Sequence, residues 1–256
     1  MEPVYRTVIG LCIATFKAKR WDIRVSGHEH VPATGGAIIA TNHISYVDFV
    51  FVGFGVRVAT PDKRLVRFAA KREVFDHKVS GPLMRAMKHI PVDRAGAASA
   101  TIDESVSRLQ QGQLVGMFPE STISQSFVPL PGKNGTVRMA QQAGVPIIPG
   151  AVWGTHRLMT KGRPRDFRSN VVMTVDFDAP MHVVPDDDPN EATAELMGRI
   201  GTLADKAQRS YPQAPEAGED PWWVPAHLGG TAPTPAEAEA WAKEAARKRR
   251  EARRSS

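Results

Sequence analysis

Residues 36–48 read GAIIATNHISYVD, and this stretch contains the transition that decides the fold. Gly36–Thr41 is a short apolar run typical of a buried strand, and a helical pattern begins at Val47 and continues to Gly53. A polar loop that contains His43 joins the two. A strand that leads through a short loop into a helix is the building unit of α/β folds.

The same alternation of apolar runs and helical patterns continues along the chain. Strands are predicted at Trp21–Ser26, Gly36–Thr41, Leu65–Lys71, His89–Asp93, Leu114–Phe118, Ile147–Trp153 and Val171–Phe177. Helices are predicted at Val47–Gly53, Ala97–Gln111, Thr136–Ala143 and Asn190–Arg209. We therefore expect an α/β fold with a central, mostly parallel sheet flanked by helices.

The composition changes at both ends of this region, which predicts three parts. Residues 1–20 are expected to form an amphipathic interfacial helix, and residues 21–211 the main domain. Residues 212–256 contain a Pro- and Trp-containing linker and a basic helix, and we expect this part to be flexible. Between Lys243 and Arg254 there are seven basic residues and two glutamates, so this tail carries most of the net charge of +6. A charged tail on a nearly neutral domain argues against a nucleic-acid-binding protein.

The N-terminal segment is amphipathic but too short to cross a membrane. Its apolar run, Thr7–Phe16, is about half of the ~20 residues that a spanning helix needs. On a helical wheel one broad apolar face forms from Val4, Tyr5, Val8, Ile9, Cys12, Ile13 and Phe16. This face predicts a helix that lies in the membrane interface, and the alternative is a surface helix packed on its own core.

His43 and Asp48 are the candidate catalytic pair. Residues five apart on a helix point about 140° away from each other. The two side chains can meet only if His43 lies in the loop and Asp48 reaches back from the first helical turn, as the pattern predicts. A carboxylate on one imidazole nitrogen fixes the tautomer and leaves the other nitrogen free to take a proton. The same spacing between His182 and Asp187 lies in an acidic turn without a strand-to-helix transition, so we discard it.

Four blocks in order strengthen this interpretation. Asn42–Asp48 resembles the first motif of the glycerolipid acyltransferases, the 1-acylglycerol-3-phosphate O-acyltransferase-like family, with its His-x-x-x-x-Asp pattern. Ile90–Arg94, Phe118–Thr122 and Val145–Pro149 resemble the second, third and fourth motifs. The resemblance covers about residues 21–177.

The resemblance implies a reaction and roles for residues. His43 would be the general base for an acceptor hydroxyl, and Asp48 would orient it. Arg94 and the loop of Glu120, Ser121 and Thr122 would help to bind a glycerol phosphate. The donor would be an acyl-CoA or acyl carrier protein thioester. A thioester is already activated, and histidine's ordinary pKa of about 6.5 suits a base near neutrality. No cofactor or metal is called for, and the single cysteine excludes a cysteine-built metal site.

One departure weakens the acceptor assignment. The family commonly has Phe-Pro-Glu-Gly-Thr-Arg in the third block, whereas this chain has Ser121 for the glycine and Ile123 for the arginine. Isoleucine cannot replace a bidentate guanidinium–phosphate contact. Phosphate binding would then fall to Arg94, Lys71 and Lys133, or the acceptor is different.

The leading expectation is acylation of the sn-2 hydroxyl of 1-acylglycerol-3-phosphate (lysophosphatidic acid), giving phosphatidic acid. The first alternative is the same chemistry on another lysophospholipid or a glycolipid. A hydrolase is a further alternative, although no serine nucleophile motif is present, and so is a protein that only binds membranes or nucleic acid through its tail. We expect the chain at the cytoplasmic face of the cell membrane, peripheral or monotopic, against anionic lipid.

Overall fold

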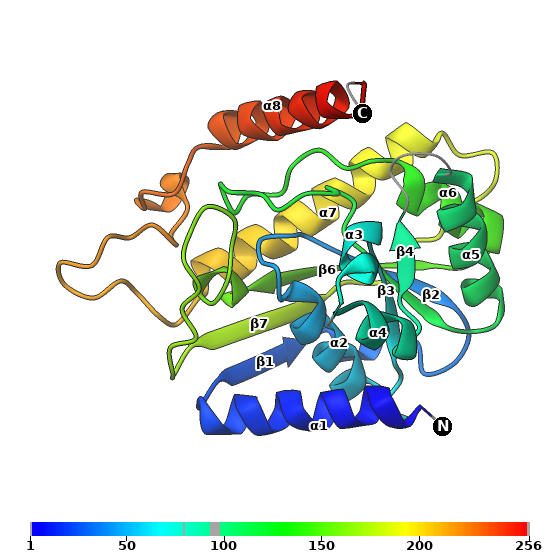
Figure 1. Ribbon diagram of the computed structural model, residues 1–256, viewed down its shortest axis with the longest axis horizontal. Helices are drawn as coiled ribbons and strands as arrows, with labels where there is room; N and C mark the ends of the chain where they lie inside the picture. Colours follow the sequence, from blue (N-terminus) through cyan, green and yellow to red (C-terminus); the bar gives the residue numbers. More distant parts are fainter. Residues whose placement is uncertain (1, 79, 93–97, 255–256) are drawn as a thin grey trace.

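The computed structural model describes residues 2–78, 80–92 and 98–254. Within these residues the chain forms a seven-stranded sheet in the order β1-β7-β6-β2-β5-β3-β4 (Figure 1). The strands are β1 (Asp22–Ser26), β2 (Ala37–Thr41), β3 (Val66–Lys71), β4 (Ile90–Val92), β5 (Leu114–Met117), β6 (Ile147–Trp153) and β7 (Val172–Phe177). Each lies within a predicted strand. The predicted strand end at Asp93 lies outside the described residues.

The sheet is mostly parallel, as predicted. Its neighbouring strands pair in parallel, except that β6 and β7 run antiparallel. The two central strands β2 and β6 are buried along their whole length. Parallel strands in α/β folds are covered on both faces, which explains why β2 reads as a continuous apolar run.

Helices cover the two faces of the sheet. They are α1 (Pro3–Ala18), α2 (Asp48–Ala59), α3 (Arg72–Asp76), α4 (Ser80–Ala86), α5 (Ala98–Gln110), α6 (Gly135–Ala143), α7 (Pro189–Arg209) and α8 (Pro235–Arg254). Successive side chains of a strand point to opposite faces. Ile39 of β2 packs in a core with α1 and α2, and Ile38 packs in a second core with α5, α6 and α7. β2 therefore lies at the centre of both cores, and the loop after it has a rigid base.

The apolar face of α1 is largely occupied by the protein itself. Tyr5 and Phe16 are buried, and Val8, Ile9 and Cys12 pack against the buried cores. The Tyr5 hydroxyl donates to the Val66 carbonyl, 2.9 Å away. The predicted lipid-facing side is thus mainly the packing side, which is the alternative that the sequence left open. Among the described residues, no helix is both long and apolar enough to span a membrane.

Part of the C-terminal stretch packs against the rest of the chain. Trp223 and Ala232 are buried, with Trp223 only 2% exposed. Beyond them, α8 runs along one side of the molecule above α7 (Figure 1). On α8, Ala238 is buried but Trp241 is 46% exposed. The packing of Trp223 does not fit a linker that is flexible throughout, whereas the division into three parts stays a prediction.

Candidate active site

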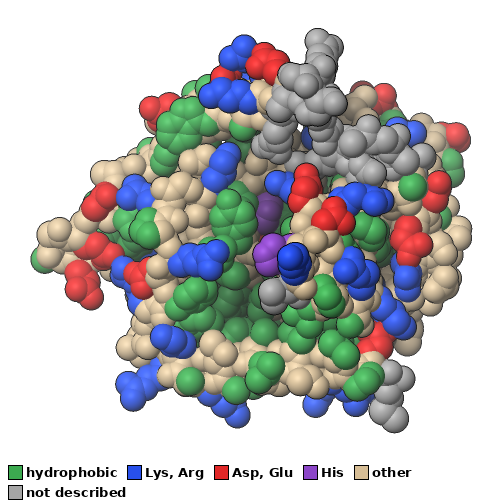
Figure 2. All heavy atoms as spheres, in the orientation of Figure 1, with side chains coloured by type: hydrophobic (Ala, Val, Ile, Leu, Met, Phe, Trp, Pro, Cys, Tyr) green, Lys and Arg blue, Asp and Glu red, His purple; other side chains and the backbone are tan. Residues whose placement is uncertain are grey.

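The His43 loop lies at the carboxyl end of β2, between the ends of β5 and β6. Ligands of open α/β sheets bind beyond the carboxyl ends of the strands. Figure 2 shows one face of the molecule on which histidine side chains lie in a hollow bordered by hydrophobic and basic side chains. The side chain of His43 is 20% exposed, so solvent and ligands can reach it.

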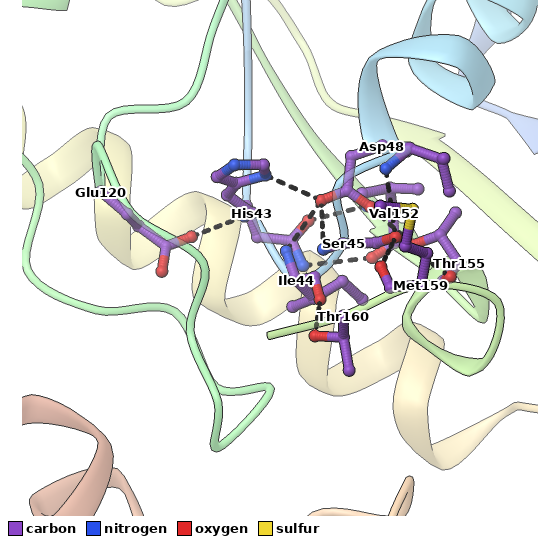
Figure 3. A network of polar contacts seen from close by, with 11 residues as sticks. His43, Ile44, Ser45, Asp48, Glu120, Val152, Thr155, Met159 and Thr160 are labelled. Atoms are coloured by element: carbon purple, nitrogen blue, oxygen red, sulfur yellow. Dashed lines mark hydrogen bonds and ion pairs between the residues drawn. The ribbon is translucent and has the colours of Figure 1, made fainter. Parts of the chain in front are cut away.

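His43 and Asp48 are in direct contact. His43 Nδ1 lies 2.9 Å from Asp48 Oδ2, and Asp48 is completely buried (Figure 3). Asp48 is the first residue of α2, while His43 lies in the loop before the helix, so the geometry predicted from the spacing is confirmed. With Nδ1 held by the carboxylate, Nε2 is the ring nitrogen that can accept a proton.

Asp48 accepts hydrogen bonds from several further donors. The backbone N–H groups of Ile44 and Ser45 each donate to Oδ2 at 2.8 Å, and the Thr155 hydroxyl donates to Oδ1 at 2.5 Å. Hydrogen bonds to the charged form and the N-terminus of a helix both stabilise a carboxylate. The Asp48 carboxylate is therefore held in a fixed position against the imidazole.

The backbone of the loop is held from two sides. The His43 N–H donates to Glu120 Oε1 at 2.7 Å, and the His43 carbonyl accepts from Ser124 N–H at 2.8 Å. On the other side, the Thr160 hydroxyl donates to the Ile44 carbonyl at 2.7 Å. Figure 3 shows Glu120 on one side of the loop, and Thr155, Met159 and Thr160 on the other. The loop is rigid because its polar backbone groups are tied to two separate segments.

This arrangement can hold a neutral imidazole ready to take a proton from a hydroxyl group. A sequence profile described as "Acyltransferase" matches residues 22–153, more than half of the chain. The chain belongs to the acyltransferase family.

Individual relatives agree with the family assignment. A 1-acyl-sn-glycerol-3-phosphate acyltransferase of Bacillus subtilis is 30% identical over 161 residues, which are 62% of this chain and 77% of the relative. A protein of the same name from Limnanthes douglasii is 34% identical over 143 residues, 55% of this chain and 48% of the relative. The crystal structure of the 1-acyl-sn-glycerophosphate (LPA) acyltransferase of Thermotoga maritima superposes with a TM-score of 0.67, at 21% identity and over 81% of each chain. That likeness shows that the two share a fold.

In this acyltransferase Glu120 braces the His43 loop. It is buried, and its Oε2 accepts from the Leu130 N–H at 2.8 Å while Oε1 accepts from His43 N–H. Burial raises the pKa of Glu120 to about 8, although the two N–H donors act in the opposite direction. With both oxygens committed to backbone amides, Glu120 positions the loop. Its predicted part in binding the acceptor stays a prediction.

The residues after Glu120 form a tight turn. Ser121 has a positive φ of 57°, and its N–H donates to the Phe118 carbonyl at 2.9 Å. A left-handed conformation favours glycine, which explains why the family commonly has glycine at this place. Ile123 is buried, at 7% exposure, so the residue at the arginine position packs inside the protein. Thr122 is half-buried beside them.

The predicted phosphate-binding residues lie at different places. Lys71 is the exposed last residue of β3. Lys133 lies in the loop before α6, where its N–H donates to the Pro119 carbonyl at 3.0 Å and ties this loop to the third motif. Arg94 lies outside the described residues. The role of all three in phosphate binding stays a prediction.

Sequence reasoning missed the residues that support the pair from a distance. Thr155 and Thr160 belong to the turn after β6, more than a hundred positions from His43 in the chain. A hydroxyl residue in a turn carries no local signal of such a partner. Within the described ranges, no three His, Cys, Asp or Glu side chains group as ligands for a metal ion.

Proposed function

We propose that this acyltransferase moves a fatty acyl group from an acyl thioester to the sn-2 hydroxyl of 1-acylglycerol-3-phosphate, giving phosphatidic acid. The observation that carries the proposal is the buried Asp48 carboxylate 2.9 Å from Nδ1 of the partly exposed His43. The acceptor follows from the names of the Bacillus subtilis and Limnanthes douglasii relatives. The donor is acyl-CoA or an acylated carrier protein.

In the proposed reaction His43 acts first as a base and then as an acid. Nε2 takes the proton of the acceptor hydroxyl while its oxygen attacks the thioester carbonyl carbon. The tetrahedral intermediate collapses, the carbon–sulfur bond breaks, and the thiolate takes the proton from His43. The products are an ester and a free thiol, and no covalent acyl-enzyme is needed. Asp48 stabilises the imidazolium that forms between the two proton transfers.

The test compares two histidines with the same spacing to an aspartate. The His43→Ala variant should lose roughly 10²–10⁴-fold in turnover of lysophosphatidic acid with acyl-CoA, and keep its fold. His182→Ala is the matched control, since exposed His182 precedes Asp187 by the same five positions. This control should turn over at the wild-type rate. Near-wild-type turnover in His43→Ala would end the proposal.

A second acceptor class is favoured by one observation. The arginine position of the third block holds Ile123, which is buried and has no charge to offer a phosphate. The same transfer to another lysophospholipid or to a glycolipid hydroxyl is therefore the alternative. A panel of acceptors with one acyl-CoA separates the two. If removal of the acceptor's phosphate leaves the rate unchanged, 1-acylglycerol-3-phosphate is the wrong acceptor.

We further propose that the enzyme works at a membrane surface, because the acceptor is a lipid. Val4 and Leu11 on α1 are exposed, 41% and 66%, and the exposed Arg6 and Lys17 lie on the same helix. Exposed apolar residues with basic neighbours favour binding to anionic lipid. The double variant Val4→Ser/Leu11→Ser should sediment less with phosphatidylglycerol vesicles than the wild-type protein. Equal sedimentation of the two would contradict this role of α1.

A further inference from the structure

One fully buried support of the His43–Asp48 pair comes from outside the region that the family profile matches. The profile ends at residue 153, and Thr155 follows two positions later. Thr155 is completely buried, and its hydroxyl donates to Asp48 Oδ1 at 2.5 Å. Since Oδ2 receives His43 and two backbone amides, Thr155 is the donor that engages the other oxygen.

The turn that carries Thr155 is tied to the catalytic loop at several points. The Ser45 hydroxyl contacts the carbonyls of Thr155 and Met159, at 3.1 and 2.6 Å. The Tyr46 N–H donates to the Met159 carbonyl at 3.1 Å. These contacts fix the Thr155 backbone relative to Asp48, with the hydroxyl beside Asp48 Oδ1.

The start of this turn is also fixed. Gly154 has φ +88°, and a Cβ there would lie 2.2 Å from the Val172 carbonyl oxygen. Only glycine allows this close approach of the turn to β7. Thr155 therefore begins its short 3-10 helix, Thr155–Arg157, from a backbone position that the sheet determines.

We propose that Thr155 is a positioning residue for catalysis, whose hydroxyl sets the rotation of the Asp48 carboxylate and through it the orientation of the His43 imidazole. The inference rests on the proposed function, since it takes His43 as the base. A carboxylate can rotate about its terminal torsion, which is broad. A donor on Oδ1 and three on Oδ2 hold it in one rotation, with Oδ2 toward the imidazole.

The hydroxyl also affects how strongly Asp48 holds a protonated imidazole. A carboxylate with one donor fewer has more negative charge to offer its remaining partners. Loss of the Thr155 hydroxyl should therefore favour the protonated imidazole, which cannot act as a base. Glu120 is a further ionisable group at this loop, and its oxygens accept from the His43 and Leu130 N–H groups.

The experiment uses the full chain with Thr155→Val, Thr155→Ser and His43→Ala. Thr155→Val should lower kcat at least about tenfold, as expected for a lost hydrogen bond to a charged group, with little change in KM. The acid limb of its kcat/KM profile should move to higher pH. Thr155→Ser keeps the hydroxyl and should restore both the rate and the profile. Thr193→Val removes another buried hydroxyl, which donates to the Pro189 carbonyl of α7, and should change neither.

The outcomes separate the two proposals. If His43→Ala is inactive but Thr155→Val keeps the wild-type kcat and pH profile, the role of Thr155 is wrong and the proposed function stands. If His43→Ala keeps its activity, the proposed function fails first. If Thr155→Val and Thr155→Ser lose the same activity with unchanged pH profiles, the residue only supports the fold, which also overturns the inference. Circular dichroism and thermal unfolding of each variant show whether it is folded.

Discussion

The imidazole of His43 stacks on the ring of Phe118, with the ring centroids 4.2 Å apart and the planes 17° apart. Phe118 in turn stacks on Phe68 of β3, at 5.9 Å and 18°. Gly116 makes room for this row, because a Cβ there would lie 2.4 Å from the Phe68 ring. The imidazole is thus held at its edge by Asp48 and on its face by Phe118.

The stack predicts that Phe118 contributes to the rate through the orientation of His43. Phe118→Leu removes the aromatic ring on which the imidazole stacks. It should lower kcat roughly 3- to 10-fold, which corresponds to the interaction energy of one aromatic pair. Phe118→Tyr keeps the ring and should retain most of the activity. Steady-state kinetics of both variants check the prediction, and equal rates for Leu and Phe at this position would contradict it.

Asp48→Asn tests the charge of the pair. The amide keeps the size of the side chain and one acceptor oxygen, but it has no negative charge and its NH₂ end cannot accept a hydrogen bond, whereas both Asp48 oxygens accept. We expect a loss of roughly 10²–10⁴-fold in kcat, since the imidazolium loses its counter-charge and the tautomer is no longer fixed. Asp187→Asn is the matched control and should keep the wild-type rate. Activity within a factor of a few of the wild type in Asp48→Asn would rule out the assigned role.

The sequence predicted the sheet well because its strands are short apolar runs between polar segments. β2 is buried on both faces and could be read from Ala37–Thr41 alone. α3 and α4 were missed because five and seven residues are too few to show a helical period. The amphipathic pattern of α1 was read correctly as a helix. Its apolar face was predicted to contact lipid, whereas it mainly packs on the protein. The sequence could not separate the two, because a lipid surface and a protein core favour the same apolar residues.

The pair His43–Asp48 was predictable because both partners lie in one strand-to-helix transition. The supports of the pair were not predictable, since Thr155 lies 107 positions from Asp48 in the chain and the pairing of β2 with β6 in the sheet brings the two together. The bracing role of Glu120 was equally hidden. Its sequence context suggested a ligand-binding loop, whereas its burial and its two amide partners depend on the tertiary fold.

Glu120 predicts a pH dependence of stability. Its pKa in the folded protein is raised from 4.5 to about 8, so between these values the folded state retains a proton that the unfolded state has lost. The unfolded state binds fewer protons in this window, and the free energy of unfolding therefore falls as pH rises from about 4.5 to about 8. A glutamine side chain cannot titrate, so in Glu120→Gln this contribution to the fall of the free energy of unfolding with pH should be absent. Urea unfolding at several pH values between 5 and 8.5 measures the free energy of unfolding of both proteins. If this free energy changes with pH in parallel for the wild type and Glu120→Gln, the prediction is contradicted.

Two buried histidines predict the opposite trend in acid. Burial lowers the pKa of His89 to about 4 and that of His156 to about 3, from 6.5. Below about pH 6.5 these two histidines are protonated in the unfolded state but stay neutral in the folded state, so the free energy of unfolding decreases as pH falls. Each group contributes about 1.4 kcal/mol per pH unit within its window. In an NMR titration both buried rings should stay neutral at pH 5.5, and protonation of either ring at that pH would refute the assignment.

The last prediction concerns the C-terminal stretch and compares two tryptophans. Trp223 is 2% exposed, its carbonyl lies 2.9 Å from His156 Nε2, and the Arg157 guanidinium lies 4.2 Å from the centroid of its ring. Both partners belong to the turn that begins at Thr155. Trp223→Ala should therefore lower the free energy of unfolding by about 3–5 kcal/mol, as for a large core residue.

The exposed Trp241 of α8 is the control, and Trp241→Ala should change stability by less than about 0.5 kcal/mol. Because Trp223 packs on the turn that holds Asp48, its variant should also lose activity below the temperature at which it unfolds. Equal thermal unfolding of the two alanine variants would mean that the C-terminal stretch does not pack on this turn. If Trp223→Ala shows the predicted loss of stability but keeps its activity, the packing of the C-terminal stretch does not influence the His43 loop.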